Sequence, residues 1–348
     1  MSGTRSSNIQ SPTSDLQNYF ATFLPAIEAE MRRNVAAPDD LALTQFYGML
    51  HYHLGWVDAD FQPAQSDSGK HIRPMLVLLC CEAAGGEWRT ALPAAAAVEL
   101  LHNFSLIHDD IEDDDPLRRG RPTLWKIWGQ AQAINAGDAL YTLAHAALNG
   151  LSDYAVPAER VLAARRRFDQ ACLVLTQGQH LDLGFESRVN VTETEYLRMV
   201  FGKTAALLEA ACGLGALIGD SDQISHYADF GRELGLAFQI QDDLLGIWGD
   251  PEVTGKPAGN DLRQRKKSLP VAYALDRSEE LRRLYAQAEV DVGAAMAELT
   301  QVGARVHAEQ LAAHHQRQAL NALEAAAQGN SATEALNALA RQLLNREA

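Results

Sequence analysis

Cysteine is scarce in this chain, which has four among its 348 residues. The four lie in apolar segments and form neither a CxxC pair nor a Cys/His spacing typical of zinc ligands. The pattern favours buried free thiols over a disulfide framework or a zinc centre. The residues concerned are Cys80, Cys81, Cys172 and Cys212.

Positive charge is also in short supply. The chain has 30 Lys and Arg residues against 45 Asp and Glu residues, a formal net charge of −15. An acidic protein is a poor general binder of nucleic acid or of an anionic membrane, so we expect no nucleic-acid partner. Hydrophobic residues make up 47% and charged residues 22%, which is typical of a folded globular chain and excludes a disordered one.

Long apolar runs are absent. The longest, such as residues 75–81 and 94–98, fall far short of the roughly 18 residues that indicate a membrane span. The first 14 residues are polar and rich in serine, without the basic and apolar regions of a secretory signal. We therefore expect no transmembrane segment, a cytoplasmic location, and a disordered tail over residues 1–15.

Strand patterns are almost absent too, whereas Ala- and Leu-rich segments with helical periodicity run nearly from end to end. The sequence predicts an all-α fold in a single domain over residues 16–348, with two long charged loops at 114–130 and 249–267. The expected helices are 17–35, 41–54, 70–84, 92–113, 131–149, 157–184, 193–219, 222–247, 268–289, 290–325 and 331–346.

Two apolar helices are predicted to end in aspartates. Asp109 and Asp113 are four residues apart, so on a helix both carboxylates project from one face. Asp242 and Asp243 end a second apolar run at 235–240. Mg²⁺ prefers oxygen ligands and takes one or two carboxylates together with phosphate oxygens and water. The clusters therefore indicate metal binding, and ordinary solvated helix ends are the alternative.

Basic residues follow each acidic cluster. Arg118 and Arg119 come after the first, and Lys256 and Lys266 come after the second. In a chain of net charge −15, cations beside metal-binding carboxylates indicate a site for phosphate, although plain ion pairs are the alternative. Residues 69–74 open another predicted helix, whose N-terminus also favours an anion.

Taken in this order, the segments resemble the trans-isoprenyl diphosphate synthases, also called polyprenyl synthetases, over roughly residues 30–345. The resemblance implies a bundle of antiparallel helices around a central cavity, the isoprenoid synthase fold, assembled as a homodimer. The matching motifs are GKHIRP at 69–74, ELLHNFSLIH at 99–108, DDIED at 109–113, RRG at 118–120, PT at 122–123, GKT at 202–204, FQIQDD at 238–243, GDP at 249–251, TGK at 254–256 and KKSLP at 266–270.

The resemblance also implies ligands and roles. Three Mg²⁺ ions and two substrates, isopentenyl diphosphate and an allylic diphosphate, would occupy the site. The implied metal ligands are Asp109, Asp110, Asp113, Asp242 and Asp243. The implied allylic diphosphate residues are Arg118, Lys203, Thr204, Gln239, Lys256 and Lys266. The implied isopentenyl diphosphate residues are Lys70, Arg73, His102 and Arg119. The implied catalytic residues are Asp109, Asp113, Arg118, Lys203 and Asp242.

The implied reaction is a Mg²⁺-dependent head-to-tail (1′-4) condensation. Metals and cations would stabilise the departing pyrophosphate electrostatically, so the reaction needs no covalent nucleophile. Ser105 and Phe104 stand four and five residues before Asp109, one helical turn from the metal ligands. An aromatic residue at the fifth position before Asp109, with a small residue at the fourth, resembles the geranylgeranyl (C20) type. A farnesyl or longer product, or simple packing of Phe104 between helices, is the alternative.

Three positions depart from the family pattern. Gly246 replaces the last aspartate of the second motif, His71 replaces a usual arginine, and Trp125 replaces a frequent histidine. The loss of one carboxylate predicts weaker metal binding or an altered rate rather than inactivity. Two other functions on the same fold are alternatives: a class I terpene cyclase, against which Lys70, Arg73 and His102 argue, and a non-catalytic subunit.

Overall fold

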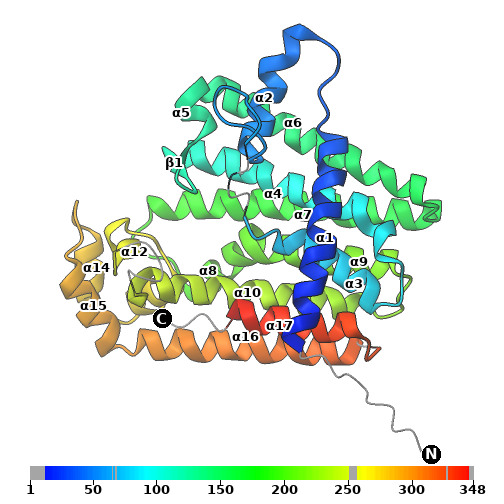
Figure 1. The fold of residues 1–348 in the computed structure, drawn as a ribbon. Helices are drawn as coiled ribbons and strands as arrows, with labels where there is room; N and C mark the ends of the chain where they lie inside the picture. The colour runs from blue at the N-terminus through cyan, green and yellow to red at the C-terminus, as the bar shows by residue number, and fades with distance from the viewer. Residues whose placement is uncertain (1–11, 65, 67–68, 251–256, 327, 345–348) are drawn as a thin grey trace, which may run out of the picture. The chain divides into compact units, whose positions relative to one another are not determined.

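The structure is a computed structural model that describes residues 12–64, 66, 69–250, 257–326 and 328–344. It confirms the all-α prediction. Figure 1 shows helices almost throughout, together with one short antiparallel hairpin, β1 (Leu117–Arg118) and β2 (Arg121–Pro122). An isolated bridge between Val57 and Pro63 is the other strand pairing in the described part of the chain.

The chain forms two compact units. Unit 1 contains the described residues up to Arg166 together with Leu214–Ser221 and Asn330–Ala335. Unit 2 contains Arg167–Gly213 and the remaining described residues from Asp222 onward. The prediction of a single domain over residues 16–348 stays a prediction.

Unit 1 is built around α4 (Leu92–Glu112), whose apolar residues are almost all buried. Helix α4 packs along α6 (Gln130–Asn149) and contacts α3 (Ile72–Ala83). The apolar sequence of α4 explains this central place, since a helix that is hydrophobic on all sides belongs in a core. The other elements are α1 (Pro12–Asn34), η1 (Leu41–Leu43), α2 (Thr44–His53), η2 (Trp88–Ala91), α5 (Leu124–Trp128), η3 (Gly150–Tyr154) and the start of α7 (Ala158–Glu186).

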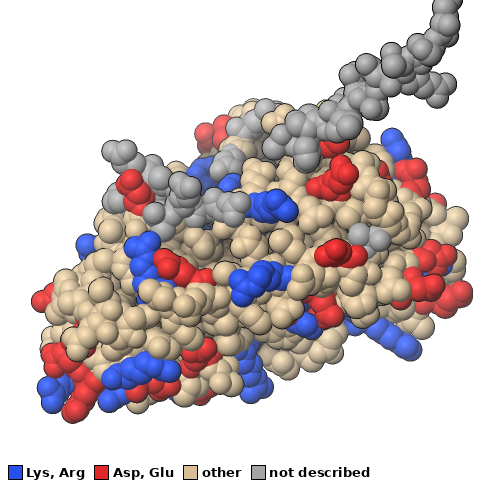
Figure 2. Space-filling view, turned by 90° about the horizontal axis from the view of Figure 1, so that it is seen from below, with Lys and Arg blue, Asp and Glu red and all other residues tan. Residues whose placement is uncertain are grey.

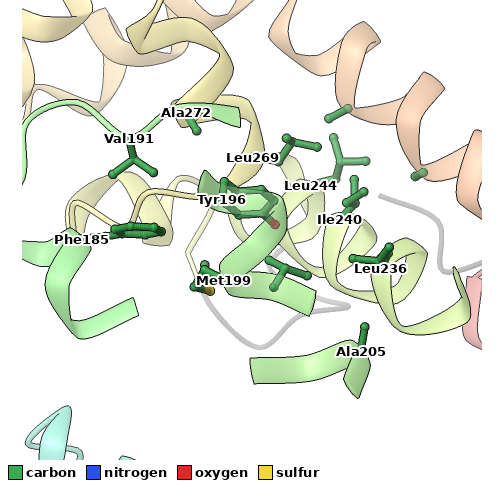
Figure 3. Packing of buried hydrophobic residues seen from close by; sticks show 13 residues of the cluster. Phe185, Val191, Tyr196, Met199, Ala205, Leu236, Ile240, Leu244, Leu269 and Ala272 are labelled. Atoms are coloured by element: carbon green, nitrogen blue, oxygen red, sulfur yellow. The ribbon is translucent and has the colours of Figure 1, made fainter. Parts of the chain in front are cut away.

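Unit 2 is built around α10 (Ile224–Trp248), which packs along α16 (Ala304–Ala326). Figure 3 shows part of its core, in which Tyr196 lies among Ile240, Leu244 and Leu269. The other elements are the rest of α7, α8 (Glu193–Val200), the π-helix η4 (Phe201–Ala205), α12 (Asn260–Arg263), α13 (Leu269–Leu275), α14 (Glu279–Tyr285) and α15 (Val292–Gln301). Two helices are divided between the units: α9 (Ala206–Ile218) belongs to unit 2 up to Gly213, and α17 (Ser331–Leu344) belongs to unit 2 from Leu336.

Two of the predicted helices are each divided into two helices in the structure. The predicted helix 268–289 is interrupted because Ser278 caps a new helix, with its Oγ accepting from the Leu281 N–H at 2.9 Å. The predicted helix 290–325 is interrupted at Gly303, whose φ of 72° no helix accommodates. Helix α1 begins at Pro12, so residues 12–15 of the expected tail are helical, and residues 1–11 lie outside the described residues.

Two helical stretches are long and apolar enough to cross a membrane by length and composition, Trp88–Glu112 and Glu193–Ile218. In each, 72% of the most apolar window is buried inside the structure, as expected for core helices. Neither stretch was predicted from the sequence as a possible span, because each contains polar residues that interrupt its apolar runs. The absence of a transmembrane segment and the cytoplasmic location stay predictions.

Charged side chains of both signs are interspersed on the face shown in Figure 2. Lys and Arg residues lie next to Asp and Glu residues, with uncharged residues between them. This face therefore has the mixed surface of an ordinary globular protein.

Candidate active site

The first aspartate motif lies at the C-terminal end of α4. The backbone N–H of Asp113 donates to the carbonyl of Asp109 at 2.8 Å, so the helical turn continues through both residues. Their carboxylates therefore project from one face of the helix, as predicted. Asp109 is half-buried and Asp113 is exposed, so both have access to solvent at the end of the helix.

Asp110, between them in sequence, faces the interior and is 2% exposed. Its carboxylate accepts from Nε of Arg118 at 2.6 Å. Burial raises the pKa of Asp110 to about 6, against the opposing attraction of Arg118. The contact fixes the guanidinium of Arg118 beside the motif. Asp110 is thus better placed to position Arg118 than to bind a metal, and its role as a ligand stays a prediction.

The hairpin that carries Arg118 and Arg119 is tied to the rest of unit 1. Arg121 donates to the carbonyls of Tyr52 at 3.2 Å and Val57 at 2.9 Å, and its guanidinium stacks over the Tyr52 ring. Trp125 donates from Nε1 to the Asp115 carbonyl at 2.9 Å. Trp125, which departs from the family pattern, therefore anchors the loop after the first motif.

A basic cluster gathers at the start of α3. Nη1 of Arg73 lies 3.3 Å from Nε2 of His102 on α4. Burial, reinforced by Arg73, lowers the pKa of His102 well below its usual value, so the imidazole is neutral and accepts from Arg73. The Arg119 guanidinium lies against Gly69, where a Cβ would come within 2.5 Å of its Nη2. Lys70 is exposed beside them. Unit 1 thus places Arg73 beside His102, and Arg119 beside the residue before Lys70; the role of these four residues in binding isopentenyl diphosphate stays a prediction.

Two residues of this region, the buried Glu99 and the half-buried His53, were not predicted from the sequence. Glu99 is 2% exposed and accepts from Nδ1 of His71 at 3.0 Å. His53 lines a small pocket of about 30 Å³ with Arg118 and Arg119. Burial and the neighbouring arginines lower the pKa of His53 to about 3, so its imidazole is neutral.

Phe104 and Ser105 occupy different surroundings on α4. The Phe104 ring is 9% exposed and contacts the ring of Tyr141 on α6, with a centroid distance of 5.1 Å. It therefore packs between two helices, as the alternative interpretation has it. Ser105 is half-buried and donates from Oγ to the His102 carbonyl at 2.9 Å. The control of product length by these two residues stays a prediction.

The second aspartate motif lies near the C-terminal end of α10 in unit 2. Asp242 is exposed, whereas Asp243 is 1% exposed. Oδ2 of Asp243 accepts from the Tyr196 hydroxyl and from the Leu269 N–H at 2.8 Å. Its Oδ1 accepts from Nε2 of Gln239 at 3.2 Å. The carboxylate of Asp243 is saturated by protein donors, so Asp242 is the residue of this motif that fits a metal.

Lys203 and Thr204 lie in the π-helix η4, an element often found at functional sites. Lys203 Nζ donates to Asp182 at 2.6 Å, and Thr204 Oγ1 donates to Gln239 Oε1 at 3.0 Å. Helix α7 approaches η4 closely at Gly178, because a Cβ there would overlap the backbone of Lys203. Asp182 was not predicted from the sequence; it lies four residues after Gly178, on the same face of the helix.

Lys266 lies 3.8 Å from the carboxylates of both Asp243 and Asp261. Burial opposes its charge, yet these carboxylates raise the pKa of Lys266. Asp261 also explains the departure at Gly246. A Cβ at Gly246 would overlap the Asp261 carboxylate, so glycine leaves room for that side chain. Lys256 lies outside the described residues.

Asp109, Asp113 and Asp242 are the acidic residues whose surroundings fit Mg²⁺. Within the described ranges, no three His, Cys, Asp or Glu residues are grouped so that they could hold an ion by themselves. Mg²⁺ usually takes only one or two carboxylates and completes its shell with water and substrate phosphate. The donor set therefore fits a metal that binds together with a diphosphate.

Helices that end in aspartates, beside arginine and lysine side chains, have the donor types that suit diphosphates and divalent metal ions. The family model for polyprenyl synthetases matches residues 55–302. The chain belongs to the polyprenyl synthetase family and is a prenyltransferase, as the sequence motifs predicted.

Two relatives and one solved structure illustrate the similarity. The chain is 51% identical over 243 residues to a geranylgeranyl diphosphate synthase of Mycobacterium tuberculosis, covering 68% of each protein. It is 48% identical over 229 residues to a (2E,6E)-farnesyl diphosphate synthase of Mycobacterium bovis, covering 65% of this chain and 62% of that protein. The structure of a geranylgeranyl pyrophosphate synthetase from Pyrococcus horikoshii matches with a TM-score of 0.86 and 32% identity, covering 97% of this chain and 100% of that one.

Proposed function

We propose that the protein condenses isopentenyl diphosphate with an allylic diphosphate to give geranylgeranyl diphosphate and pyrophosphate. The observation that carries this proposal is the cluster of Lys70, Arg73, His102 and Arg119 in unit 1. These residues form a diphosphate site that contains no carboxylate facing solvent and therefore suits a substrate bound without metal. A terpene cyclase, which uses a single allylic diphosphate, has no need for this second site.

The allylic diphosphate would bind to the aspartate motifs and to the cations beside them. We propose that Asp109, Asp113 and Asp242 hold the metals, three in number, and that Arg118 and Lys203 bind phosphate oxygens directly. Arg118 is fixed by Asp110, and Lys203 is fixed by Asp182. Both cations are thus oriented before the substrate arrives, which reduces the reorganisation required during the reaction.

When bound, Mg²⁺ supplies electrostatic stabilisation of the charge that develops on the departing diphosphate. The allylic C–O bond breaks, and its electron pair leaves with the pyrophosphate. The double bond of isopentenyl diphosphate then forms a bond to C1 of the allylic cation, and the new cation loses a proton to the pyrophosphate. Lys70, Arg73, His102 and Arg119 hold isopentenyl diphosphate in place for this attack, which gives the benefit of proximity.

The C20 product rests on two observations that agree. A small Ser105 follows Phe104 one turn before Asp109, and the relative from Mycobacterium tuberculosis is named a geranylgeranyl diphosphate synthase. The farnesyl-named relative from Mycobacterium bovis makes C15 the second candidate. We further propose that the protein acts as a homodimer in the cytoplasm.

The release of pyrophosphate tests the reaction and the metal ligands together. With Mg²⁺, farnesyl diphosphate and isopentenyl diphosphate, Asp109→Ala and Asp242→Ala should each lower kcat by orders of magnitude, because charge stabilisation is lost in the transition state. Asp115→Ala, in the same acidic run, should change kcat less than about threefold. If the two motifs act on one diphosphate, the double variant should be far less impaired than the product of the single losses predicts.

Two outcomes would contradict the proposal. A hydrocarbon formed from geranylgeranyl diphosphate alone would favour a terpene cyclase. No pyrophosphate release by the wild-type protein with both substrates would favour a non-catalytic subunit.

A further inference from the structure

His71 stands between two residues that we assign to the isopentenyl diphosphate site, Lys70 and Arg73, and the reaction described above gives it no role. It immediately precedes α3, with φ of 46°, between Lys70 and Arg73 in sequence. Its Nδ1 donates to Oε1 of Glu99 at 3.0 Å. The imidazole is 19% exposed, whereas the Glu99 side chain that it contacts is 3% exposed.

Glu99 is the buried negative charge of this cluster. It is 2% exposed and also accepts from Nδ2 of Asn103 at 3.3 Å. A buried carboxylate needs a positive partner, since an unpaired charge in the interior is strongly destabilising. Two candidates are close: His71, in direct contact, and Arg73, whose positive charge stabilises the Glu99 carboxylate as well.

Arg73 also has a donor that the protein leaves unused. Its Nη1 contacts His102, but its buried Nε has no hydrogen-bond partner among the described residues. A buried donor without a partner is costly and calls for an explanation. A phosphate oxygen of isopentenyl diphosphate would satisfy it.

We propose that His71 is a positioning residue of the isopentenyl diphosphate site, and that its imidazolium neutralises Glu99 so that the charge of Arg73 is available to the substrate. The inference rests on the proposed function, because it assigns this cluster to isopentenyl diphosphate. When His71 loses its proton, Glu99 is left with Arg73 as its counter-charge. The site then has one positive charge fewer, and the diphosphate binds more weakly.

The charged groups around His71 favour its protonated form on balance. Glu99 on α4 and Glu28 on α1 stabilise the imidazolium, whereas Arg119 after β1 opposes it, as do the adjacent Lys70 and Arg73 by like charge. Burial lowers the pKa of His71, but the hydrogen bond to Glu99 and the negative charges of Glu99 and Glu28 together outweigh it, and the net shift of the pKa is upward. An arginine, the usual family residue here, keeps its charge at every pH. This chain therefore differs from that pattern by having an affinity that depends on pH.

Steady-state kinetics across pH 6–9 test the inference in wild type, His71→Arg and His71→Asn with saturating farnesyl diphosphate. Wild type and His71→Arg should have similar KM values for isopentenyl diphosphate at pH 6. At pH 9 the wild-type KM should exceed that of His71→Arg roughly fivefold, because one positive charge that is partly screened by solvent is lost. His71→Asn, which keeps a donor but no charge, should have a raised KM at every pH. The kcat of all three should agree within about threefold.

The ratio of the KM values of two variants at one pH cancels the effect of substrate ionisation, because that effect is the same for all three proteins. His51→Asn is the matched control, because His51 hydrogen-bonds the Val35 carbonyl outside this cluster. Its KM profile should follow wild type. Parallel profiles for wild type and His71→Arg, or an unchanged KM in His71→Asn, would overturn the inference and leave His71 a structural residue.

Calorimetric binding of isopentenyl diphosphate alone, without Mg²⁺ or an allylic substrate, separates this inference from the proposed function. At pH 8, wild type should take up protons on binding, whereas His71→Arg should take up fewer. This result would support the inference even if no condensation product were found. Equal proton uptake in the two proteins would contradict it even if the enzyme were active.

Discussion

The carboxylate of Asp243 accepts a hydrogen bond from the backbone N–H of Leu269 at 2.8 Å, so the second aspartate motif caps α13. The same carboxylate accepts from the Tyr196 hydroxyl inside the core of unit 2. Asp242, next in sequence, is exposed. Two adjacent aspartates of one motif therefore have different surroundings, one in the core and one in solvent.

Substitution should separate these two roles. Asp243→Ala leaves the Tyr196 hydroxyl and the Leu269 N–H buried without an acceptor, and should lower the free energy of unfolding by about 3 kcal/mol. Asp242→Ala should change it by less than about 0.5 kcal/mol, as is usual for an exposed side chain, while abolishing most activity. Urea unfolding measures the change in the free energy of unfolding of each variant. Equal losses of stability in the two variants would contradict the assignment.

Gly178 on α7 should resist substitution because a Cβ there overlaps the backbone of Lys203. Gly178→Ala should lower the free energy of unfolding by about 1–3 kcal/mol and reduce kcat, since it displaces the η4 turn that carries Lys203. Gly184→Ala on the same helix is the matched control. No atom lies within 4 Å of a Cβ at Gly184, so alanine should stabilise the protein by up to about 1 kcal/mol. Thermal unfolding and kcat of the two variants check this, and equal behaviour would refute the close approach.

The pair of His71 and Glu99 should make stability depend on pH at both ends. Burial would raise the pKa of Glu99, but His71 outweighs it and lowers the pKa to about 2, so this contribution is present above pH 4.5 and is lost as pH falls toward 2. The pKa of His71 is raised from 6.5, so its contribution is present below pH 6.5 and is lost as pH rises through the folded value.

The stability difference between wild type and Glu99→Gln should therefore be greatest between about pH 4.5 and 6.5, at roughly 3 kcal/mol. Urea unfolding of both proteins from pH 3 to 9 measures it. A difference that does not vary with pH would show that the two side chains form no ion pair.

Ser105→Phe should shorten the product. A phenylalanine on the turn before Asp109 fills space that the growing chain would need, so the main product should change from C20 to C15. Ser105→Ala, which keeps a small side chain, should retain the wild-type product. Mass analysis of the dephosphorylated products decides between the two results, and a C20 product from Ser105→Phe would disprove control of length at this position.

Helical periodicity located the long helices well. The prediction 92–113 corresponds to α4 at Leu92–Glu112, and 222–247 corresponds to α10 at Ile224–Trp248. Periodicity reports which residues are buried, and burial continues along a helix regardless of its neighbours. Breaks were harder to predict. The π-helix η4 (Phe201–Ala205) lies against Gly178, which is distant in sequence. A local sequence pattern cannot reveal such a contact.

Candidate site residues could be predicted where they belong to a recognisable sequence motif, as at Asp109–Asp113 and Lys70–Arg73. The residues that hold the motifs in place could not. Asp182 pairs with Lys203 across 21 residues, Glu99 with His71 across 28, and Tyr196 with Asp243 across 47. Each is a single residue whose role exists only once folding has brought its partner near. Asp110 and Asp243 are buried and accept hydrogen bonds from protein donors, contacts that the motif does not reveal, and their role as metal ligands stays a prediction.

The most direct test of the central claim is the mass of the product formed from farnesyl diphosphate and isopentenyl diphosphate by the purified protein with Mg²⁺. The account predicts a C20 diphosphate together with pyrophosphate, and neither of them when isopentenyl diphosphate is left out or when the metal is chelated. Formation of a hydrocarbon without isopentenyl diphosphate, or a condensation product that persists after complete removal of divalent metal, would contradict it.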